Sequence, residues 1–259
     1  MAIQKKTEKE IEILREGGKR LAAALFEVVD MIVPGVRTDE LDTRAEELLS
    51  HGDDRPAFLN YTPSDASRPF PASVCVSIND EIVHGIPNEN PRTLKEGDIV
   101  SLDMGLVHNG LITDSSYTVP VGEVSDEAQM LLKATQEALN AGISTARGGS
   151  RVGDISAAIE AVGRSYNLGI FPTLVGHGVG YELHEEPYIP NIGRAGTGPI
   201  LEPGLVIAIE PMFSLGSDAI KTLDDGYTYA TKDGSLSAQF EHTIVITEEE
   251  PIILTQRPV

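Results

Sequence analysis

The chain has 259 residues, 41% of them hydrophobic, and its 40 acidic against 20 basic residues give a formal net charge of −20. An acidic surface repels phosphate backbones and anionic lipids, which excludes sequence-specific nucleic acid and membrane surfaces as expected partners. The single cysteine, Cys75, excludes an intramolecular disulfide, and residues 1–10 lack the apolar core of a signal peptide. We therefore expect a compact cytoplasmic protein with a sizeable core.

The first half of the chain is predicted to open with helices and to continue with strands. Thr7-Glu8-Lys9-Glu10 has the form of a capping box, and the helix that begins there is stopped by Pro34-Gly35. A second helix is predicted over 39–50, and the polar stretch 52–68 is predicted to be irregular. Strands are expected at 73–78, 98–106 and 111–119.

The second half of the chain repeats this order. Ser125-Asp126-Glu127 begins a helix that ends at Gly148-Gly149, and another helix is predicted over 154–167. Strands follow at 173–176, 205–213, 237–246 and 252–255. Helices first and strands later, twice over, indicate an α+β fold rather than alternating βαβ units.

Two short sequence matches point to an internal duplication. The segment 35–41 is echoed by 149–155, and both lead into a helix. The segments 94–103 and 201–210 each have a Leu, a Gly three residues later, an apolar run and a final carboxylate. Such turn signals are also common by chance. If the duplication is real, halves of about 1–124 and 125–259 pack about a pseudo-twofold axis as a single domain.

A tight turn brings two carboxylates together. Asn109-Gly110 lies between two strand-like runs and is typical of a two-residue type I′ hairpin. That turn pairs Gly105 with Asp114, so Asp103 and Asp114 share one face as diagonal neighbours about 7 Å apart. Two carboxylates placed in this way repel each other unless a positive charge lies between them.

Three further residues of metal-ligating type lie on or beside predicted strands. Glu210 ends the apolar run 206–210, Glu241 lies in the strand 237–246, and His177 is set among glycines in 176–180. Each carboxylate alone could simply face solvent at a strand end. Four carboxylates facing inward instead require cations, and two divalent ions would balance them. Oxygen and imidazole donors without thiolate favour manganese, iron, cobalt or zinc, and two ions about 4 Å apart can activate a water. The residues thus indicate a dinuclear metallohydrolase.

Six motifs, in order along nearly the whole chain, closely resemble those of type I methionine aminopeptidases. The family has the pita-bread fold, in which an antiparallel sheet covered by helices forms two pseudo-twofold halves, so the resemblance implies a single catalytic domain over 1–259. The short spacing between Glu210 and Glu241 leaves no room for the helical insertion of type II members. The motifs are Asn79–Pro87, the pair Asp103 and Asp114, Gly176–Gly180, Leu183–Pro187, Ile209–Met212 and Ser237–Thr243.

The resemblance also implies a role for each candidate metal ligand. Asp103 would bind one of two divalent ions (Co, Mn, Fe or Zn), whereas Asp114 and Glu241 would bridge both. His177 and Glu210 would complete the second ion, and Glu210 would accept the proton of the attacking water. The family's activity implies that the chain removes the initiator methionine from nascent proteins when the next residue is small.

Two histidines are implied to contact the substrate rather than the metals: His184 near the scissile carbonyl and His84 near the peptide nitrogen. On residues alone, His84 could be a loop histidine and His184 an ion-pair partner of Glu185-Glu186. The other histidines are read as structural, with His51 and His108 exposed beside turns and His242 pointing away from the Glu241 face. The methionine side chain would lie against Phe58, Tyr61, Phe70, Cys75, Leu183 and Tyr227.

One segment departs from the family pattern. Residues 62–69 are longer than the usual short turn, and we expect them to reshape the rim of the pocket. Cys75 has a plainer interpretation as a small buried hydrophobic residue on a strand. We expect a monomer that contacts the ribosome at most transiently. Two alternatives remain: a proline-specific peptidase of the same fold, which usually carries an extra N-terminal domain, and a non-catalytic pita-bread binding module, which would be expected to have lost metal ligands.

Overall fold

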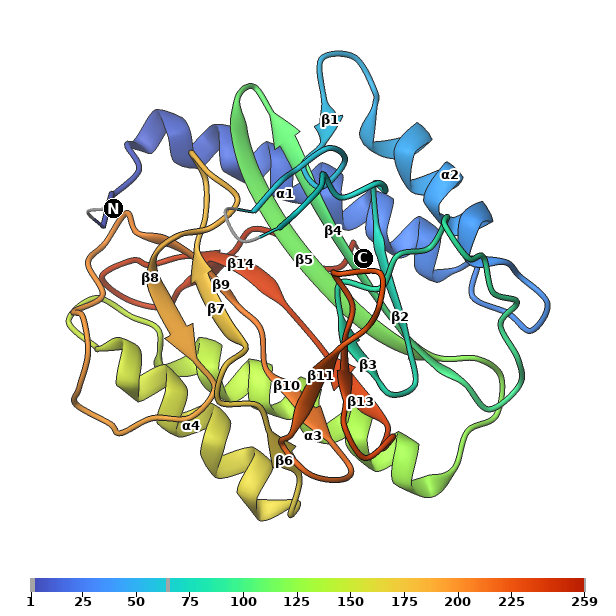
Figure 1. The fold of residues 1–259 in the computed structure, drawn as a ribbon. Coiled ribbons are helices and arrows are strands. Elements are labelled where there is room, and N and C mark those ends of the chain that lie inside the picture. Colours follow the sequence, from blue (N-terminus) through green and yellow to red (C-terminus); the bar gives the residue numbers. More distant parts are fainter. Residues whose placement is uncertain (1–2, 64–65, 259) are drawn as a thin grey trace.

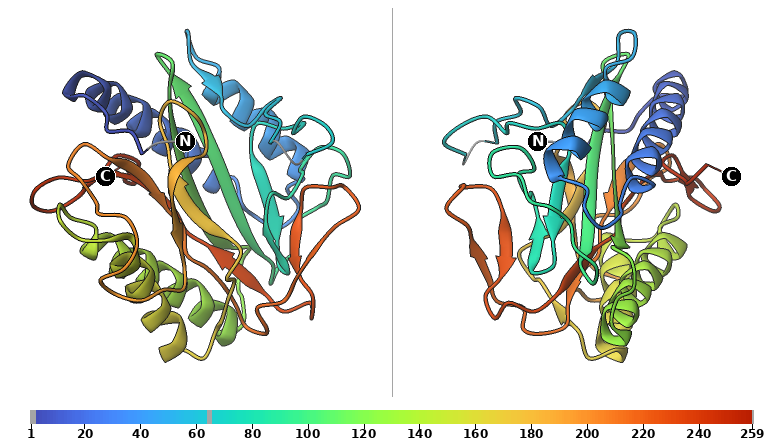
Figure 2. Two further views of the ribbon diagram at one scale, coloured as in Figure 1. Left: turned by 60° about the vertical axis from the view of Figure 1, so that its left-hand side comes forward. Right: turned by 90° about the vertical axis from the view of Figure 1, so that its right-hand side faces the viewer.

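Four helices pack beside antiparallel strands in the computed structural model, which describes residues 3–63 and 66–258 (Figure 1). In the right-hand view of Figure 2, α1, α3 and α4 lie on one side of the strands together with the C-terminal end, and the loops drawn in cyan lie on the other side. No helix in the described ranges combines the length and apolar character needed to cross a bilayer. The helices are α1 (Glu8–Val29), α2 (Thr38–Leu49), α3 (Asp126–Thr145) and α4 (Val152–Ser165).

The helix starts follow the capping signals of the sequence. Thr7 Oγ1 accepts from the Glu10 backbone N–H at 3.4 Å, and Glu10 Oε2 accepts from the Thr7 N–H at 2.7 Å, which confirms the capping box of α1. The helix ends at Val29, before the predicted stop at Pro34, because the chain continues in turns from Asp30. The remaining helices begin within two residues of their predicted starts.

The central sheet carries the long hairpin of β4 (Ile99–His108) and β5 (Leu111–Pro120), with β2 (Cys75–Ile78) and β1 (Arg55–Pro56) on the other edge of β4. Its register confirms the predicted turn, since Gly105 pairs with Asp114 and Asp103 with Ser116. Cys75 pairs with Asp103 on the neighbouring strand. The hairpin therefore places both carboxylates on one face of the sheet.

Two predicted strands each divide into two strands of different sheets. The run 205–213 forms β9 (Val206–Ile209) and β10 (Met212–Ser214), and the run 237–246 forms β13 (Ser237–Gln239) and β14 (His242–Val245). The breaks fall beside Glu210 and Glu241, where the chain crosses from one sheet to the next. Pro211, which has no N–H to donate, helps to end β9. Glu210 and Glu241 thus lie at strand ends.

The remaining strands are short. The five-stranded sheet runs β15-β14-β9-β7-β8, and the two smaller sheets run β13-β10-β6 and β11-β12-β3. The sequence patterns missed β1, β3, β6, β8, β11 and β12 because segments of two to six residues carry too little alternation to be recognised. The bounds are β3 (Glu81–Val83), β6 (Gly169–Ile170), β7 (Val175–Gly178), β8 (Glu185–Pro190), β11 (Ile220–Thr222), β12 (Tyr229–Thr231) and β15 (Ile252–Ile253).

Matching hydrogen bonds support the internal duplication. The Gly35 N–H donates to the Leu94 carbonyl at 2.8 Å, and at the corresponding place the Gly149 N–H donates to the Leu201 carbonyl at 3.0 Å. Both glycines have positive φ, 101° and 85°, a conformation that disfavours other residues. The two halves therefore share turn geometry as well as sequence.

Each half has its own apolar cluster between helices and strands. Leu21 and Leu25 of α1 pack with Leu102 and Met104 of β4, whereas the second cluster joins α3 and α4 to β9, β10 and β13. Burial of each such leucine contributes about 2 kcal/mol. The helices therefore support the strands from behind and leave the other face for the carboxylates.

The prediction for His108 is wrong, whereas His51 is exposed as predicted. His108 is buried because the end of the β4–β5 hairpin packs against α1. A Cβ added to Gly17 of α1 would lie only 3.0 Å from the Cβ of His108. The Nδ1 of His108 lies 2.6 Å from Asp54 Oδ1. His242 packs structurally, with Nδ1 at 3.0 Å from Thr255 Oγ1.

Candidate metal centre and substrate pocket

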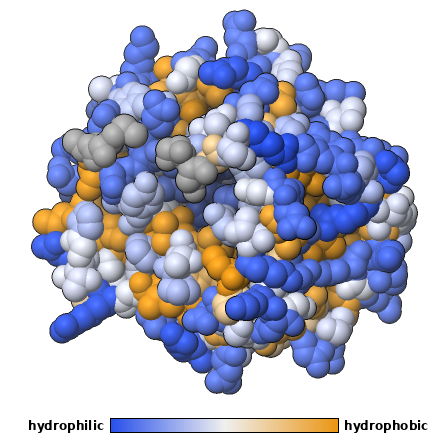
Figure 3. All heavy atoms as spheres, in the orientation of Figure 1, coloured by the Kyte–Doolittle hydropathy of each residue, from blue (hydrophilic) through white to orange (hydrophobic). Residues whose placement is uncertain are grey.

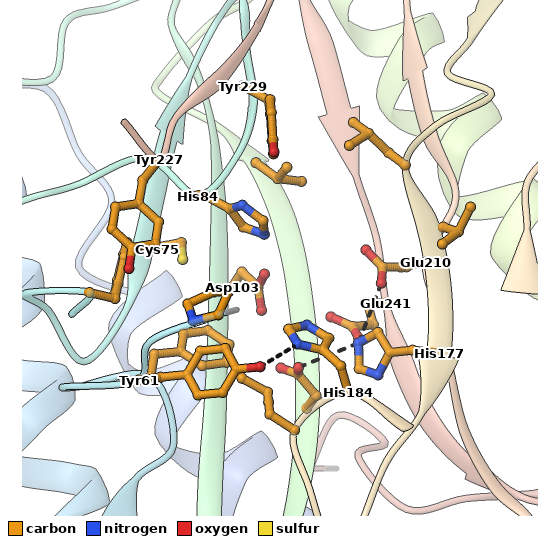
Figure 4. A pocket seen from close by; sticks show the side chains of 18 of the residues that line it. Tyr61, Cys75, His84, Asp103, His177, His184, Glu210, Tyr227, Tyr229 and Glu241 are labelled. Atoms are coloured by element: carbon orange, nitrogen blue, oxygen red, sulfur yellow. Dashed lines mark hydrogen bonds and ion pairs between the residues drawn. The ribbon is translucent and has the colours of Figure 1, made fainter. Parts of the chain in front are cut away.

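The five predicted metal ligands converge at one place, although they come from three strands and two strand ends far apart in the sequence (Figure 4). Asp103 lies on β4, Asp114 on β5 and His177 on β7, while Glu210 follows β9 and Glu241 precedes β14. The structure therefore brings together residues of both duplicated halves. All but the half-buried Glu210 are buried.

The imidazole of His177 faces the carboxylates. One ligand atom each of Asp114, His177 and Glu241 lie within 4.8 Å of one another. His177 Nε2 is 3.9 Å from Asp114 Oδ2 and 3.6 Å from Glu210 Oε1, and its Nδ1 donates to the Gly178 carbonyl at 2.9 Å. That hydrogen bond leaves the lone pair of Nε2 directed at the acidic cluster, the arrangement that a metal ligand needs.

Unpartnered oxygens indicate that a cation belongs in this cluster. Oδ1 of Asp103, Oδ1 of Asp114 and Oε1 of Glu241 are buried without a hydrogen-bond partner among the described residues. Buried polar atoms are rarely left in this state, and burial of a carboxylate without a counter-charge is costly. The donor set, carboxylates with one imidazole, fits divalent transition metals.

The ionisation behaviour of these groups agrees with that fit. Burial raises the pKa of Asp103 to about 7, and burial followed by repulsion from neighbouring carboxylates raises the pKa values of Asp114, Glu210 and Glu241 well above their usual range. Burial lowers the pKa of His177 to about 3, so its imidazole is neutral at pH 7. Only positive charge would let all four carboxylates ionise together.

A cavity of about 410 Å³ opens beside this cluster. All six residues predicted for the methionine pocket line it, together with His84, His184 and the candidate metal ligands. Aromatic side chains, among them Phe58, Phe70 and Tyr227, form part of the wall, and the cavity is large enough for one long side chain together with the first peptide unit. Further lining residues that the sequence patterns did not single out include Met212, Tyr188 and Tyr229.

Known proteins are similar in sequence to this chain over nearly its whole length. The model of metallopeptidase family M24 matches residues 12–248. A methionine aminopeptidase of Aquifex aeolicus is 44% identical over 260 residues, which cover 99% of this chain and 100% of that protein. The chain belongs to metallopeptidase family M24, with the methionine aminopeptidases. Methionine aminopeptidase 1 of Bacillus subtilis is likewise 44% identical. That alignment covers 97% of this M24 chain and 98% of the Bacillus protein.

Solved structures confirm the fold. The methionine aminopeptidase of Thermotoga maritima superposes with a TM-score of 0.93 at 42% identity, covering 98% of this M24 chain and 100% of that chain. A prolidase from Pyrococcus furiosus reaches a TM-score of 0.77 at 23% identity and shows the fold alone, over 66% of its own length. The predicted α+β pita-bread fold and the assignment to metallopeptidases, hydrolases that use a metal, are therefore confirmed.

The two histidines predicted to contact the substrate, His84 and His184, lie in the cavity wall of this M24 enzyme. The Nδ1 of His184 lies 3.0 Å from Tyr61 Oη, and its ring stacks edge-on against His177 with centroids 4.4 Å apart. The alternative of a surface ion pair with Glu185 is wrong, because Glu185 is bonded to Lys6 instead. His84 has a positive φ of 61° and lies 5.6 Å from the ring of Tyr229, so it is a loop histidine whose ring nonetheless lines the cavity.

The segment 62–69 does lie at the rim. Pro63 and Ala66 line the cavity, whereas Ser64 and Asp65 lie outside the described residues. Arg68 forms an ion pair with Glu89, and its carbonyl accepts from Tyr227 Oη at 2.5 Å. The ring of Tyr227 meets Phe70 edge-to-face at 5.2 Å. The longer segment therefore holds one of the pocket's aromatic walls.

Cys75 satisfies both interpretations considered for it. The residue is buried on β2, and it also lines the cavity. Burial raises the pKa of its thiol well above the usual range, followed in size by the effect of the Asp103 carboxylate. The thiol is therefore protonated at pH 7 and acts as an apolar wall atom rather than as a nucleophile.

Two supporting residues escaped the sequence analysis. Gln239 Nε2 donates to Glu210 Oε2 at 3.1 Å, and Thr243 Oγ1 donates to the Asp114 carbonyl at 2.7 Å while accepting from the Asp114 N–H at 2.9 Å. A signal was present, because Gln239, Glu241 and Thr243 alternate with a period of two. The Gln239 bond orients the Glu210 carboxylate, and the two Thr243 bonds hold the backbone that carries Asp114.

Proposed function

We propose that this M24 metallopeptidase is a methionine aminopeptidase that removes the initiator methionine from nascent proteins when the next residue is small. The observation that carries the proposal is the direct opening of an acidic cluster with unpartnered oxygens onto a cavity of about 410 Å³ with aromatic and sulfur-bearing walls. A flexible thioether suits such walls. The sequence identity to methionine aminopeptidases supports the same assignment.

The acidic cluster is proposed to hold two divalent ions, drawn from cobalt, manganese, iron and zinc. Two such ions balance the charge of four carboxylates, and the neutral His177 adds an imidazole donor. Asp103 would bind one ion, and His177 and Glu210 would bind the other. Asp114 and Glu241 would contribute to the binding of both ions. When bound, the ions supply Lewis-acid activation of water and of the scissile carbonyl.

Glu210 is proposed to move the proton. Its Oε2 is held by the Gln239 side chain at 3.1 Å, whereas Oε1 faces His177. Burial raises the pKa of this carboxyl group in the metal-free protein, and the charge of bound divalent ions would keep it ionised and able to accept a proton. Glu210 would accept a proton from water and deliver it to the leaving amine.

His184 and His84 are proposed to orient the substrate. Nδ1 of His184 lies 3.0 Å from Tyr61 Oη, and in the proposed tautomer this hydroxyl donates to Nδ1 while the proton on Nε2 is donated to the scissile carbonyl oxygen. Burial lowers the pKa of His184, which keeps the ring neutral at pH 7. His84, across the cavity in Figure 4, would contact the peptide nitrogen. A donor placed at the developing oxyanion lowers the barrier.

The contact with the ribosome is proposed from charge. A net charge of −20 disfavours lasting contact with ribosomal RNA, so we expect this contact to be transient at most. We also propose a cytoplasmic location and a monomeric state. Polar side chains alternate with separate apolar patches on the face shown in Figure 3.

Peptide hydrolysis tests the proposal. Chelator-stripped protein reloaded with Mn²⁺ or Co²⁺ is expected to cleave Met-Ala-Ser at least about tenfold faster, in kcat/KM, than Leu-Ala-Ser. Stripped protein should be inactive. A preference for Xaa-Pro dipeptides would instead indicate the proline-specific alternative, and no metal-dependent turnover of any peptide would indicate a non-catalytic module.

A further inference from the structure

The segment that precedes α1 crosses to the second half of the molecule. The Lys6 N–H donates to the Gly204 carbonyl at 2.8 Å, and Lys5 Nζ forms an exposed ion pair with Glu202 at 2.7 Å. The neighbouring lysines differ sharply, since the Lys5 side chain is 54% exposed and the Lys6 side chain is 0% exposed. A lysine is almost never buried in this way without a partner.

The partner of Lys6 is Glu185. Lys6 Nζ lies 2.5 Å from Glu185 Oε2 and 4.5 Å from the centre of the Tyr181 ring. The second oxygen of Glu185, Oε1, accepts from the backbone N–H groups of Tyr181 at 2.5 Å and Glu182 at 3.0 Å. One buried carboxylate therefore joins the N-terminal segment to the loop 178–185. Removing one member of such a pair leaves an uncompensated charge.

That loop connects two groups of the proposed active site. It begins after His177 and ends with Leu183 and His184, both of which line the cavity. Its ends are paired, Gly178 with Glu185, so Glu185 closes the base of the loop and is the immediate neighbour of His184. A Cβ on Gly180 would lie 2.4 Å from Lys6 Cε, which shows how closely the loop wraps around the lysine.

We propose that Lys6 is a positioning residue for His184. Lys6 is not among the described residues that line the cavity, so it acts through Glu185 and the loop 178–185. Its ammonium fixes the Glu185 carboxylate, the carboxylate fixes the loop backbone, and the backbone sets the His184 ring against Tyr61. The inference rests on the proposed function, because it assigns His184 a contact with the substrate.

A double-mutant cycle tests this role. We expect Lys6→Met to lower kcat by about tenfold or more on the peptide that the wild type cleaves fastest, with KM changed by less than about threefold. The matched control Lys5→Met should stay within about twofold of the wild type. In a His184→Ala background, Lys6→Met should cost less than about twofold, because the ring that it positions is gone. An equal loss in both backgrounds, or equality with Lys5→Met, overturns the proposal.

Two further measurements keep the test decisive. If Lys6→Met does not fold, the double variant Lys6→Met/Glu185→Met removes both charges and should fold. Its kcat should still be lower than that of the wild type. In a His184→Ala background, the same double substitution should lower kcat no further. NMR of the metal-free protein gives a readout without turnover. The His184 imidazole resonances, assigned with His184→Ala, should shift or broaden in Lys6→Met and not in Lys5→Met. Unchanged His184 resonances in Lys6→Met contradict the role of Lys6. If the wild type shows no preference for methionine, only the proposed function is contradicted.

Discussion

The floor and the rim of the cavity are built in different ways. The floor consists of metal-ligand candidates on or beside paired strands, such as Asp103 and Asp114, whose positions follow from backbone hydrogen bonds. The rim consists of aromatic residues on loops, such as Tyr227, whose hydroxyl donates to the backbone carbonyl of Arg68 beside the exposed Arg68–Glu89 pair. The proposed metal chemistry is therefore placed on or beside paired strands, and the proposed selectivity on loops that can vary without disturbing it.

The largest effect is expected at the floor. Asp103→Asn keeps the size of the side chain and removes one of the negative charges that a divalent ion needs, so kcat/KM should fall by about a thousandfold or more. The fold should persist, because the strand pairing of β4 is untouched, and circular dichroism with thermal unfolding checks this. Asp30→Asn, an exposed carboxylate at the end of α1, is the matched control. Normal turnover of Asp103→Asn would remove the proposed dinuclear mechanism.

The next largest effect is the pH dependence of metal-free stability. Folding raises the pKa values of the four floor carboxyl groups above those of the unfolded chain, so the folded state binds more protons. Its stability is then lost as pH rises toward the folded pKa values. The histidines with lowered pKa act oppositely, but only below about pH 6.5, where the unfolded imidazoles charge.

Above that pH the carboxyl groups therefore decide the sign. The Tm of chelator-stripped protein should fall between about pH 6.5 and 8.5, and added Mn²⁺ should raise Tm most at the upper end. Thermal unfolding with and without metal measures both trends. A metal-free Tm that rises over this range would contradict the buried, unpaired state of the carboxylates.

A smaller effect is expected at the rim. Tyr227→Ala removes the ring that packs on Phe70, so KM for Met-Ala-Ser should rise by about tenfold while kcat changes by less than about threefold. Steady-state kinetics separate these two constants. A loss confined to kcat would mean that the rim takes part in the chemistry, which would end the division between floor and rim.

The smallest effect is expected from the clamp on the rim. Arg68→Ala breaks the ion pair with Glu89, which is more than a third exposed, so KM should rise by only about twofold to threefold. Arg44→Ala, which breaks a similarly exposed pair with Glu27 far from the cavity, should leave KM unchanged. If the two variants behave alike, the Arg68 side chain has no part in holding Tyr227, and the backbone carbonyl of residue 68, which Arg68→Ala retains, is sufficient.

The same division explains what the sequence could predict. The turn at Asn109-Gly110 fixed the register of Asp103 and Asp114, because a two-residue hairpin leaves one pairing. The strand breaks beside Glu210 and Glu241 were missed, since an apolar run does not show where the chain changes sheets. The burial of His108 and the Lys6–Glu185 pair were missed because they depend on contacts between segments 54 and 179 residues apart.

Metal binding measured together with turnover tests the central claim most directly. Equilibrium dialysis of stripped protein against Mn²⁺ should give two ions per chain for the wild type, with Met-Ala-Ser cleavage rising as the ions bind, and fewer than two for inactive Asp103→Asn. The contrary result is two ions and full cleavage in Asp103→Asn, or a wild type that cleaves Met-Ala-Ser without binding metal.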